Sequence, residues 1–129
     1  MREIKFRAWI KEENVMIDVP ILNFRDKTIK TLYTQPCDKW EYQFEEIELM
    51  QFTGLYDKNK VPIYEGDIVR YFENECAYIY WNKDRMAWGI EPIDKEVYFD
   101  SPYLSDNTNI EVIGNIYDNP DLLGAWRYV

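Results

Sequence analysis

Three short, largely apolar runs, separated by short polar turns, constrain the fold of this chain most. They are DIVRYF at 67–72, CAYIYW at 76–81 and MAWGI at 86–90, with ENE and NKDR between them. Short apolar runs with β-branched and aromatic residues are typical of β-strands, and such short polar gaps are typical of hairpin turns. The runs therefore predict three successive antiparallel strands.

Two further runs extend this pattern to a small barrel. EVYF at 96–99 is predicted as a fourth strand and IEVIGNIY at 110–117 as a fifth. Within the fifth run, Gly114 interrupts the alternation as a bulge or bend would. Five short strands with tight turns are typical of an SH3-like barrel, which we place over residues 64–117.

The N-terminal half predicts two hairpins. EIKFRAWI and VMIDV stand on either side of KEEN, so residues 3–19 form the first hairpin, which Pro20 ends. ILNF and TIKTLY stand on either side of a polar turn at 25–27 and form the second, because Thr, Ile and Tyr favour strands.

Residues 38–46 are ambiguous between helix and strand. Their apolar residues fit helical spacing, and Asp38 with Glu41 resembles a capping box. The aromatic residues of the same segment also alternate as a strand would. We favour a short helical or irregular segment that passes into a strand at 47–52.

Together these elements predict a mostly β protein with a minor helical part. Asn119 and Pro120 supply the N-cap and first turn of a short C-terminal helix, which Gly124 ends. The N-terminal β-hairpins, residues 1–63, are expected to pack on the SH3-like barrel and helix, residues 64–129. The two parts are subdomains of one compact domain, since no flexible linker separates them.

The charge distribution argues against a nucleic-acid surface in the C-terminal half. The net charge is −9, and residues 65–129 carry 5 Lys+Arg against 13 Asp+Glu, a net of −8. Binding to a phosphate backbone needs cationic contacts. Aromatic residues make up 17% of the chain, and this surplus indicates that some rings lie on the surface, where they contact a partner or a second copy.

The absence of histidine limits the chemistry. It excludes Ser-His-Asp and Cys-His catalysis and most zinc sites, and the 5 glycines do not cluster into a phosphate-binding loop. DKNK at 57–60 begins like a calcium loop, but Val61 and Pro62 replace a ligand and the required glycine, so we interpret it as a turn. A glycosidase-like pair of carboxylates is brought together by the fold and not by sequence spacing, so the sequence leaves such a pair open. We predict no enzyme, no cofactor and no metal.

The cysteines and the N-terminus predict a cytoplasmic protein. Cys37 and Cys76 are too few for a secreted disulfide framework, and we expect both to be free. MREIKFRAW offers no signal-peptide core, and no run approaches the roughly 20 apolar residues of a membrane span.

Two groups of residues are candidates for specific roles. Tyr78, Tyr80 and Trp88 form an aromatic set that can be core, a protein-binding face or a stacking platform for nucleic acid. In YEGDIV, Gly66 supplies a positive φ in a tight turn, and Asp67 bonds local backbone amides. The second group predicts the start of a strand rather than an acidic site.

Three stretches of the sequence resemble the YopX family of phage and prophage proteins. They are MREIKFRAW at the start, LMQFTGLYDKNKVPIYEGDIV at 49–69 and EVIGNIYDNPDLL at 111–123. The family turn usually has glycine where this chain has Lys60, which affects the turn type only. The resemblance implies a β-rich intracellular protein with an SH3-like portion, encoded by a phage or prophage in a bacterial host, for which a homo-oligomer is plausible. It supplies no catalytic residue or ligand, because the family is of uncharacterised function.

Three functions follow as hypotheses. The first is a non-enzymatic phage accessory protein that binds a protein or assembles with itself, because rings are in surplus and catalytic groups are missing. The second is an acidic mimic of nucleic acid, which needs carboxylates arrayed on one face. The third is a nucleic-acid-binding small barrel, which rests on analogy of fold alone.

Overall fold

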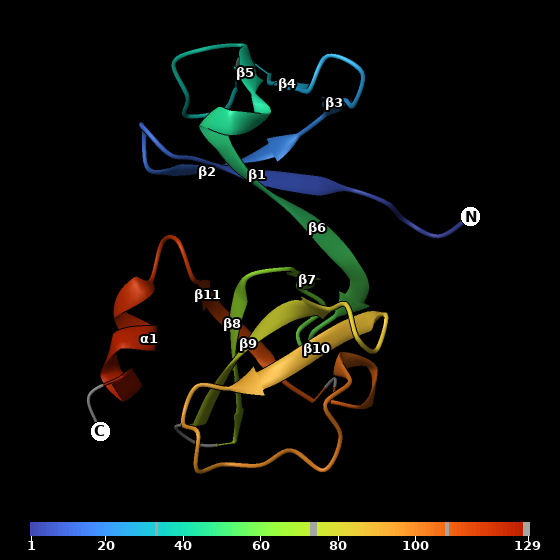
Figure 1. The fold of residues 1–129 in the computed structure, drawn as a ribbon, viewed down its shortest axis with the longest axis vertical. Helices are drawn as coiled ribbons and strands as arrows, with labels where there is room; N and C mark the ends of the chain where they lie inside the picture. The colour runs from blue at the N-terminus through green and yellow to red at the C-terminus, as the bar shows by residue number, and fades with distance from the viewer. Residues whose placement is uncertain (33, 73–74, 108, 128–129) are drawn as a thin grey trace. The chain divides into compact units, whose positions relative to one another are not determined.

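The computed structural model describes residues 1–32, 34–72, 75–107 and 109–127. The fold is mostly β, with three antiparallel sheets, one of them a curled half-barrel, and one short C-terminal helix (Figure 1). The chain divides into two compact units, Met1–Phe52 and Thr53–Val129. The sequence placed the boundary at residues 63 and 64. Ile63 lies in the core of the second unit, and the boundary between the two units falls earlier in the chain, after Phe52.

The predicted first hairpin is present in the first unit. Strand β1 (Phe6–Ile10) pairs antiparallel with β2 (Val15–Val19) through a turn in which Asn14 donates its N–H to the carbonyl of Ile10. The first half of β6 (Ile47–Tyr56) pairs with the other edge of β1.

The predicted second hairpin forms a separate small sheet. Strand β3 (Ile21–Asn23) pairs with β4 (Thr28–Lys30), and β4 pairs with β5 (Glu41–Gln43). Leu22, Ile29 and Tyr42 stand side by side across this sheet. They pack with the first hairpin in a core whose fully buried members are Ala8, Ile10, Ile17, Ile29, Tyr42 and Ile47.

The ambiguous segment combines both alternatives. Strand β5 is followed at once by a single 3-10 turn, η1 (Phe44–Glu46), and then by β6. A capping box is present, but it joins Gln43 and Glu46 rather than Asp38 and Glu41. The helical spacing of the sequence therefore corresponds to one turn, and the alternation corresponds to the strand before it.

The three strands expected from the regular runs and tight turns are present in the second unit. Strands β8 (Asp67–Phe72), β9 (Glu75–Asn82) and β10 (Ala87–Pro92) are consecutive antiparallel neighbours, and β11 (Glu111–Asn115) pairs with the free edge of β8. The register shifts between Val112 and Gly114, which confirms the predicted bulge. Strand β7 (Pro62–Tyr64) lies beside β6.

The prediction of a strand at EVYF is wrong. Residues 96–99 are irregular, because Asp94 closes a turn in which its carboxylate accepts the N–H of Glu96 and its carbonyl accepts that of Val97. The edge of β10 is bridged instead further along the chain, between Gly89 and Tyr103. A 3-10 turn, η2 (Leu104–Asp106), follows.

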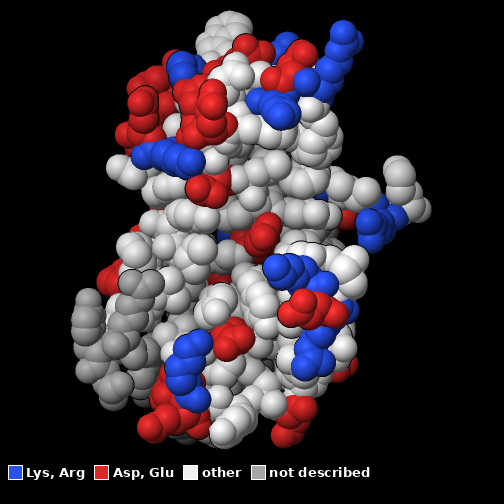
Figure 2. All heavy atoms as spheres, in the orientation of Figure 1, with Lys and Arg blue, Asp and Glu red and all other residues white. Residues whose placement is uncertain are grey.

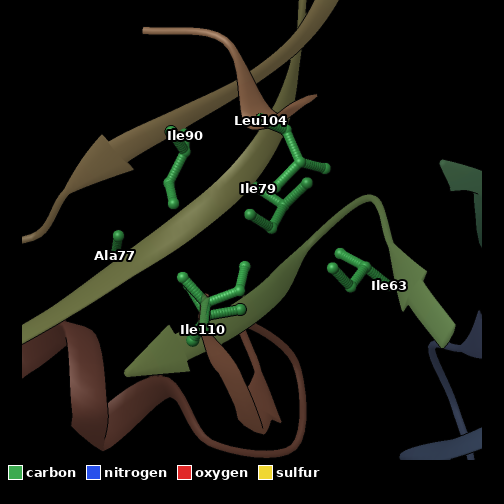
Figure 3. Packing of buried hydrophobic residues seen from close by; sticks show 7 residues of the cluster. Ile63, Ala77, Ile79, Ile90, Leu104 and Ile110 are labelled. Atoms are coloured by element: carbon green, nitrogen blue, oxygen red, sulfur yellow. The ribbon is translucent and has the colours of Figure 1, made fainter. Parts of the chain in front are cut away.

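The core of the second unit lies against the concave side of its sheet. Ala77 and Ile79 from β9, Ile90 from β10, Ile63 and Leu104 belong to this one cluster, which is drawn in Figure 3. Val69 and Ile110 are the other buried members of this cluster. This cluster fixes which face of β9 and β10 is interior, and so which side chains remain for the outer face.

The C-terminal helix α1 (Pro120–Arg127) begins where Asn119 and Pro120 predict it. The prediction that Gly124 ends the helix is wrong, because the helix runs through it. A glycine ends a helix when it adopts a positive φ, and Gly124 does not. Among the residues described, no helix is long and apolar enough to cross a membrane.

Candidate functional site

The structure separates the aromatic set that the sequence grouped together. Trp88 pairs with Trp81, so it shares the face of the core residues Ala77 and Ile79 and packs against the core. Tyr78 and Tyr80 project from the opposite, outer face of β9, because successive side chains of a strand alternate. Only the two tyrosines therefore belong to one surface.

The rings of Tyr78 and Tyr80 lie close together on this outer face. Their centroids are 5.8 Å apart with the planes inclined at 50°. Gly89 stands opposite Tyr80 in β10, and a Cβ there would lie 2.7 Å from the Tyr80 ring. The glycine thus lets the ring lie flat across β10, while Asn82 donates its amide to the Tyr80 hydroxyl at 3.3 Å.

Two adjoining cavities open beside these tyrosines, and Lys95 lines both. The first, about 290 Å³, is lined by Tyr78, Lys95 and three aliphatic side chains, Ile93, Ile116 and Leu123. The second, about 240 Å³, lies between β10 and the following loop; its lining includes Tyr80, Glu91, Pro92, Tyr98, Phe99 and Pro102. We call Tyr78, Tyr80 and the linings of these two cavities the tyrosine face.

The electrostatics of the tyrosine face are mild. Lys95 and Glu91 form a surface ion pair at 3.4 Å. Burial raises the pKa of Tyr78, with a further contribution from the Glu91 carboxylate, so its hydroxyl stays protonated and can donate a hydrogen bond. The face therefore offers apolar walls with a few polar groups, which is the make-up of a binding site rather than of an acid–base pair.

The turn before β8 has the form that the sequence predicts. Gly66 has a φ of +85°, and Asp67 accepts the N–H of Tyr64 at 2.7 Å. The side chain of Asp67 is buried, with 1% exposure. A buried carboxylate that holds a backbone amide stabilises the turn and has no opening to a substrate.

Asp57 has a structural role that the sequence analysis missed. One carboxylate oxygen accepts the N–H groups of Asn59 and Val61, and the other accepts that of Val112 at 2.9 Å. The turn at 57–60 is thus tied to β11 rather than being a plain turn. Within the described residues, no three Asp, Glu or Cys side chains are grouped to hold a metal ion.

A polar network around Tyr42 lies in the first unit and was also missed. The buried Tyr42 hydroxyl donates to Glu13 and accepts the N–H of Lys39. The Lys39 ammonium in turn lies 2.5 Å from the Glu46 carboxylate. Burial, followed by the Glu13 carboxylate, raises the pKa of Tyr42, so the hydroxyl remains a donor. These polar groups bond to one another, so we interpret the network as one that stabilises the sheet containing β4 and β5.

Cys37 and Cys76 are free thiols, both half-buried. Burial raises the pKa of the Cys76 thiol, although Arg70 opposes this. A raised thiol pKa lowers the thiolate fraction at neutral pH and hence the reactivity. The environment of Cys76 is therefore that of a small packed residue.

Comparisons with known proteins give one family model and a similar solved structure. The family model described as YopX protein matches residues 5–124. The crystal structure of protein EF1440 from Enterococcus faecalis is similar, with a TM-score of 0.68 and 26% identity over 95% of this chain and 99% of that one. No curated protein matches the chain.

Proposed function

The chain belongs to the YopX family, and from this premise we propose that it is a phage- or prophage-encoded accessory protein that binds another protein without catalysing a reaction. It acts in the cytoplasm of the bacterial host. The curled sheet of the second unit serves, in this proposal, as a small SH3-like barrel that presents the tyrosine face.

The observation that carries the proposal is the tyrosine face itself. Two cavities meet at Lys95, and aromatic and aliphatic side chains supply most of their walls. Tyrosine provides a large apolar surface and a hydroxyl at little cost in side-chain entropy, which is why it is enriched at protein interfaces. The absence of histidine in the chain supports a role in binding rather than catalysis.

Affinity capture with matched variants tests the proposal. Tyr78→Arg places a charge on the tyrosine face, whereas Phe72→Arg places the same charge on an exposed residue at the end of β8. We expect a host or phage protein to bind the wild type and Phe72→Arg but not Tyr78→Arg. The captured protein, once purified, should bind the wild type again. Equal capture by all three proteins, or no capture by any, would count against the proposal.

Self-assembly is the second form of the same proposal. Light scattering of the wild type separates the two forms, because an assembly through the tyrosine face has a mass above one chain that Tyr78→Arg reduces. If the wild type has the mass of one chain at all concentrations, self-assembly is excluded and the partner must be a different protein.

Nucleic-acid functions receive less support. The second unit carries 7 Lys+Arg and 14 Asp+Glu, a net of −7, which disfavours contact with phosphates. On the face drawn in Figure 2, basic side chains stand among the acidic ones, so this face offers no continuous array of carboxylates for a mimic. A gel shift at low salt tests direct binding, and we expect none.

A further inference from the structure

The cavity between β10 and its following loop combines aromatic rings with a carboxylate. Tyr80, Tyr98 and Phe99 line it, together with two prolines and Glu91. Aromatic faces attract cations through the ring quadrupole, and a carboxylate at the same cavity adds a full negative charge. This lining is unlike that of the neighbouring cavity, whose walls other than Tyr78 and Lys95 are aliphatic.

Two of the rings are held in place by the fold. Tyr80 lies across Gly89, as described above. Phe99 packs on Tyr71 with ring centroids 4.3 Å apart. Tyr98 is 89% exposed and forms an outer wall. The cavity is therefore preformed on two sides, which lowers the entropic cost of binding, and it has a ring free to close over a guest.

The charged side chains that line the cavity are one acid, Glu91, and one base, Lys95. The segment that contains them, residues 91–100, also carries three further acids, Asp94, Glu96 and Asp100, and no further base. Lys95 reaches Glu91 at 3.4 Å, but its side chain is 76% exposed. Exposed pairs of this kind contribute little, so a cation that also stacks on the rings can take the place of Lys95 at Glu91.

We propose that this cavity binds the guanidinium group of an arginine side chain. The proposal rests on the proposed function, since the arginine would belong to the bound protein. A guanidinium is planar, weakly hydrated and able to stack on aromatic faces while it donates two hydrogen bonds to one carboxylate. An ammonium lacks the planar fork, so lysine would bind this lining less well.

A titration followed by NMR of the ¹⁵N-labelled full chain tests the proposal. The probe is N-acetyl-arginine amide, and the control is its neutral isostere N-acetyl-citrulline amide. We expect saturable shifts confined to the amides of Tyr80, Glu91, Tyr98 and Phe99 with arginine and none with citrulline. Equal shifts with both probes, or no saturable shift with arginine, would overturn the proposal.

Three variants assign the binding to the cavity. Glu91→Gln should weaken arginine binding about fivefold, the upper size of the contribution of an exposed ion pair. Lys95→Gln should strengthen it, because the competing ammonium is gone. Asp84→Asn removes an acid on the exposed β9–β10 turn and should change nothing. If Glu91→Gln fails to fold, Lys95→Gln alone decides, since unchanged or weaker binding would contradict the proposal.

The outcomes separate this proposal from the function on which it rests. If Glu91→Gln binds a captured partner as tightly as the wild type does, while Tyr78→Arg no longer binds it, the protein-binding function stands and the arginine cavity fails. If arginine saturates the cavity but no partner or assembly depends on the tyrosine face, the cavity stands and the function fails.

Discussion

At the scale of single residues, Lys60 holds a backbone conformation that side chains disfavour. Its φ is +64°, in the turn where its N–H bonds the carbonyl of Asp57. Residues with a Cβ adopt this conformation at a cost of roughly 1 kcal/mol, whereas glycine does not. We expect Lys60→Gly to raise the free energy of unfolding by about 0.5–1 kcal/mol in urea denaturation. Asn59→Gly, at a residue without a positive φ, should lower the free energy of unfolding. If both variants raised this free energy, or neither did, the explanation from the φ of Lys60 would be contradicted.

Tyr71 carries a buried hydroxyl that finds no hydrogen-bond partner among the described residues. Burial, then the carboxylates of Glu75 and Asp94, raises its pKa to about 12. The stability linked to the neutral hydroxyl is therefore complete below about pH 10, the pKa of an unfolded tyrosine, and is lost as the pH rises toward 12.

Replacing Tyr71 by phenylalanine tests this linkage. Tyr71→Phe should leave stability at pH 7 unchanged or raise it by up to about 1 kcal/mol, because no hydrogen bond is lost. It should also reduce the decline in the free energy of unfolding between pH 10 and 12. Tyr98→Phe, at an exposed hydroxyl, is the matched control and should keep the wild-type profile. A marked loss at pH 7 in Tyr71→Phe would reveal a partner for the hydroxyl.

At the scale of elements, Asp57 connects the β6–β7 turn to β11. Its side chain is 5% exposed, and both oxygens accept backbone amides. Asp57→Asn puts an NH₂ donor against one of these amides, so we expect a loss of about 1.5–3 kcal/mol in the free energy of unfolding. Asp84→Asn in the exposed β9–β10 turn should cost little. Hydrogen exchange should locate the effect at Val112, and an effect spread over both units would contradict a local link.

The strands that could be predicted are those that short runs of β-favouring residues and turns specify. Strands β8, β9 and β10 were predicted because their residues favour strands and their turns are short. The strand at 96–99 was not correctly predicted, since Asp94 uses the local amides in a turn that alternation does not reveal. When one side chain binds the backbone amides that a neighbouring strand would otherwise bind, the periodicity of the sequence does not predict the outcome.

The candidate site could be predicted only in part, for a related reason. Tyr78 and Tyr80 share a face because they are two residues apart in one strand. Trp88 was grouped with them, yet its face depends on the register between β9 and β10, which pairs it with Trp81. The cavities depend on a loop whose path no local pattern encodes. Local spacing thus predicts faces within a strand, while sites between elements require the register.

At the scale of the whole molecule, the two units have separate cores. The fully buried cluster of the first unit lies within residues 1–52, and that of the second lies within residues 53–129. The second unit contains the four-stranded sheet β10-β9-β8-β11 and both cavities of the tyrosine face. A chain of its length can bury a sufficient core alone, whereas one of about 50 residues is marginal.

We therefore expect the fragment 53–129 to fold alone, although β6 loses the half that pairs with β1. It should give dispersed amide signals and a single cooperative transition in urea, at a lower midpoint than the full chain. Ile79→Ala, which empties the centre of its core, should cost about 2–5 kcal/mol and unfold the fragment. Fragment 1–52 should show a weaker transition. A fragment 53–129 that stays unfolded would mean that its core forms only when residues 1–52 are attached.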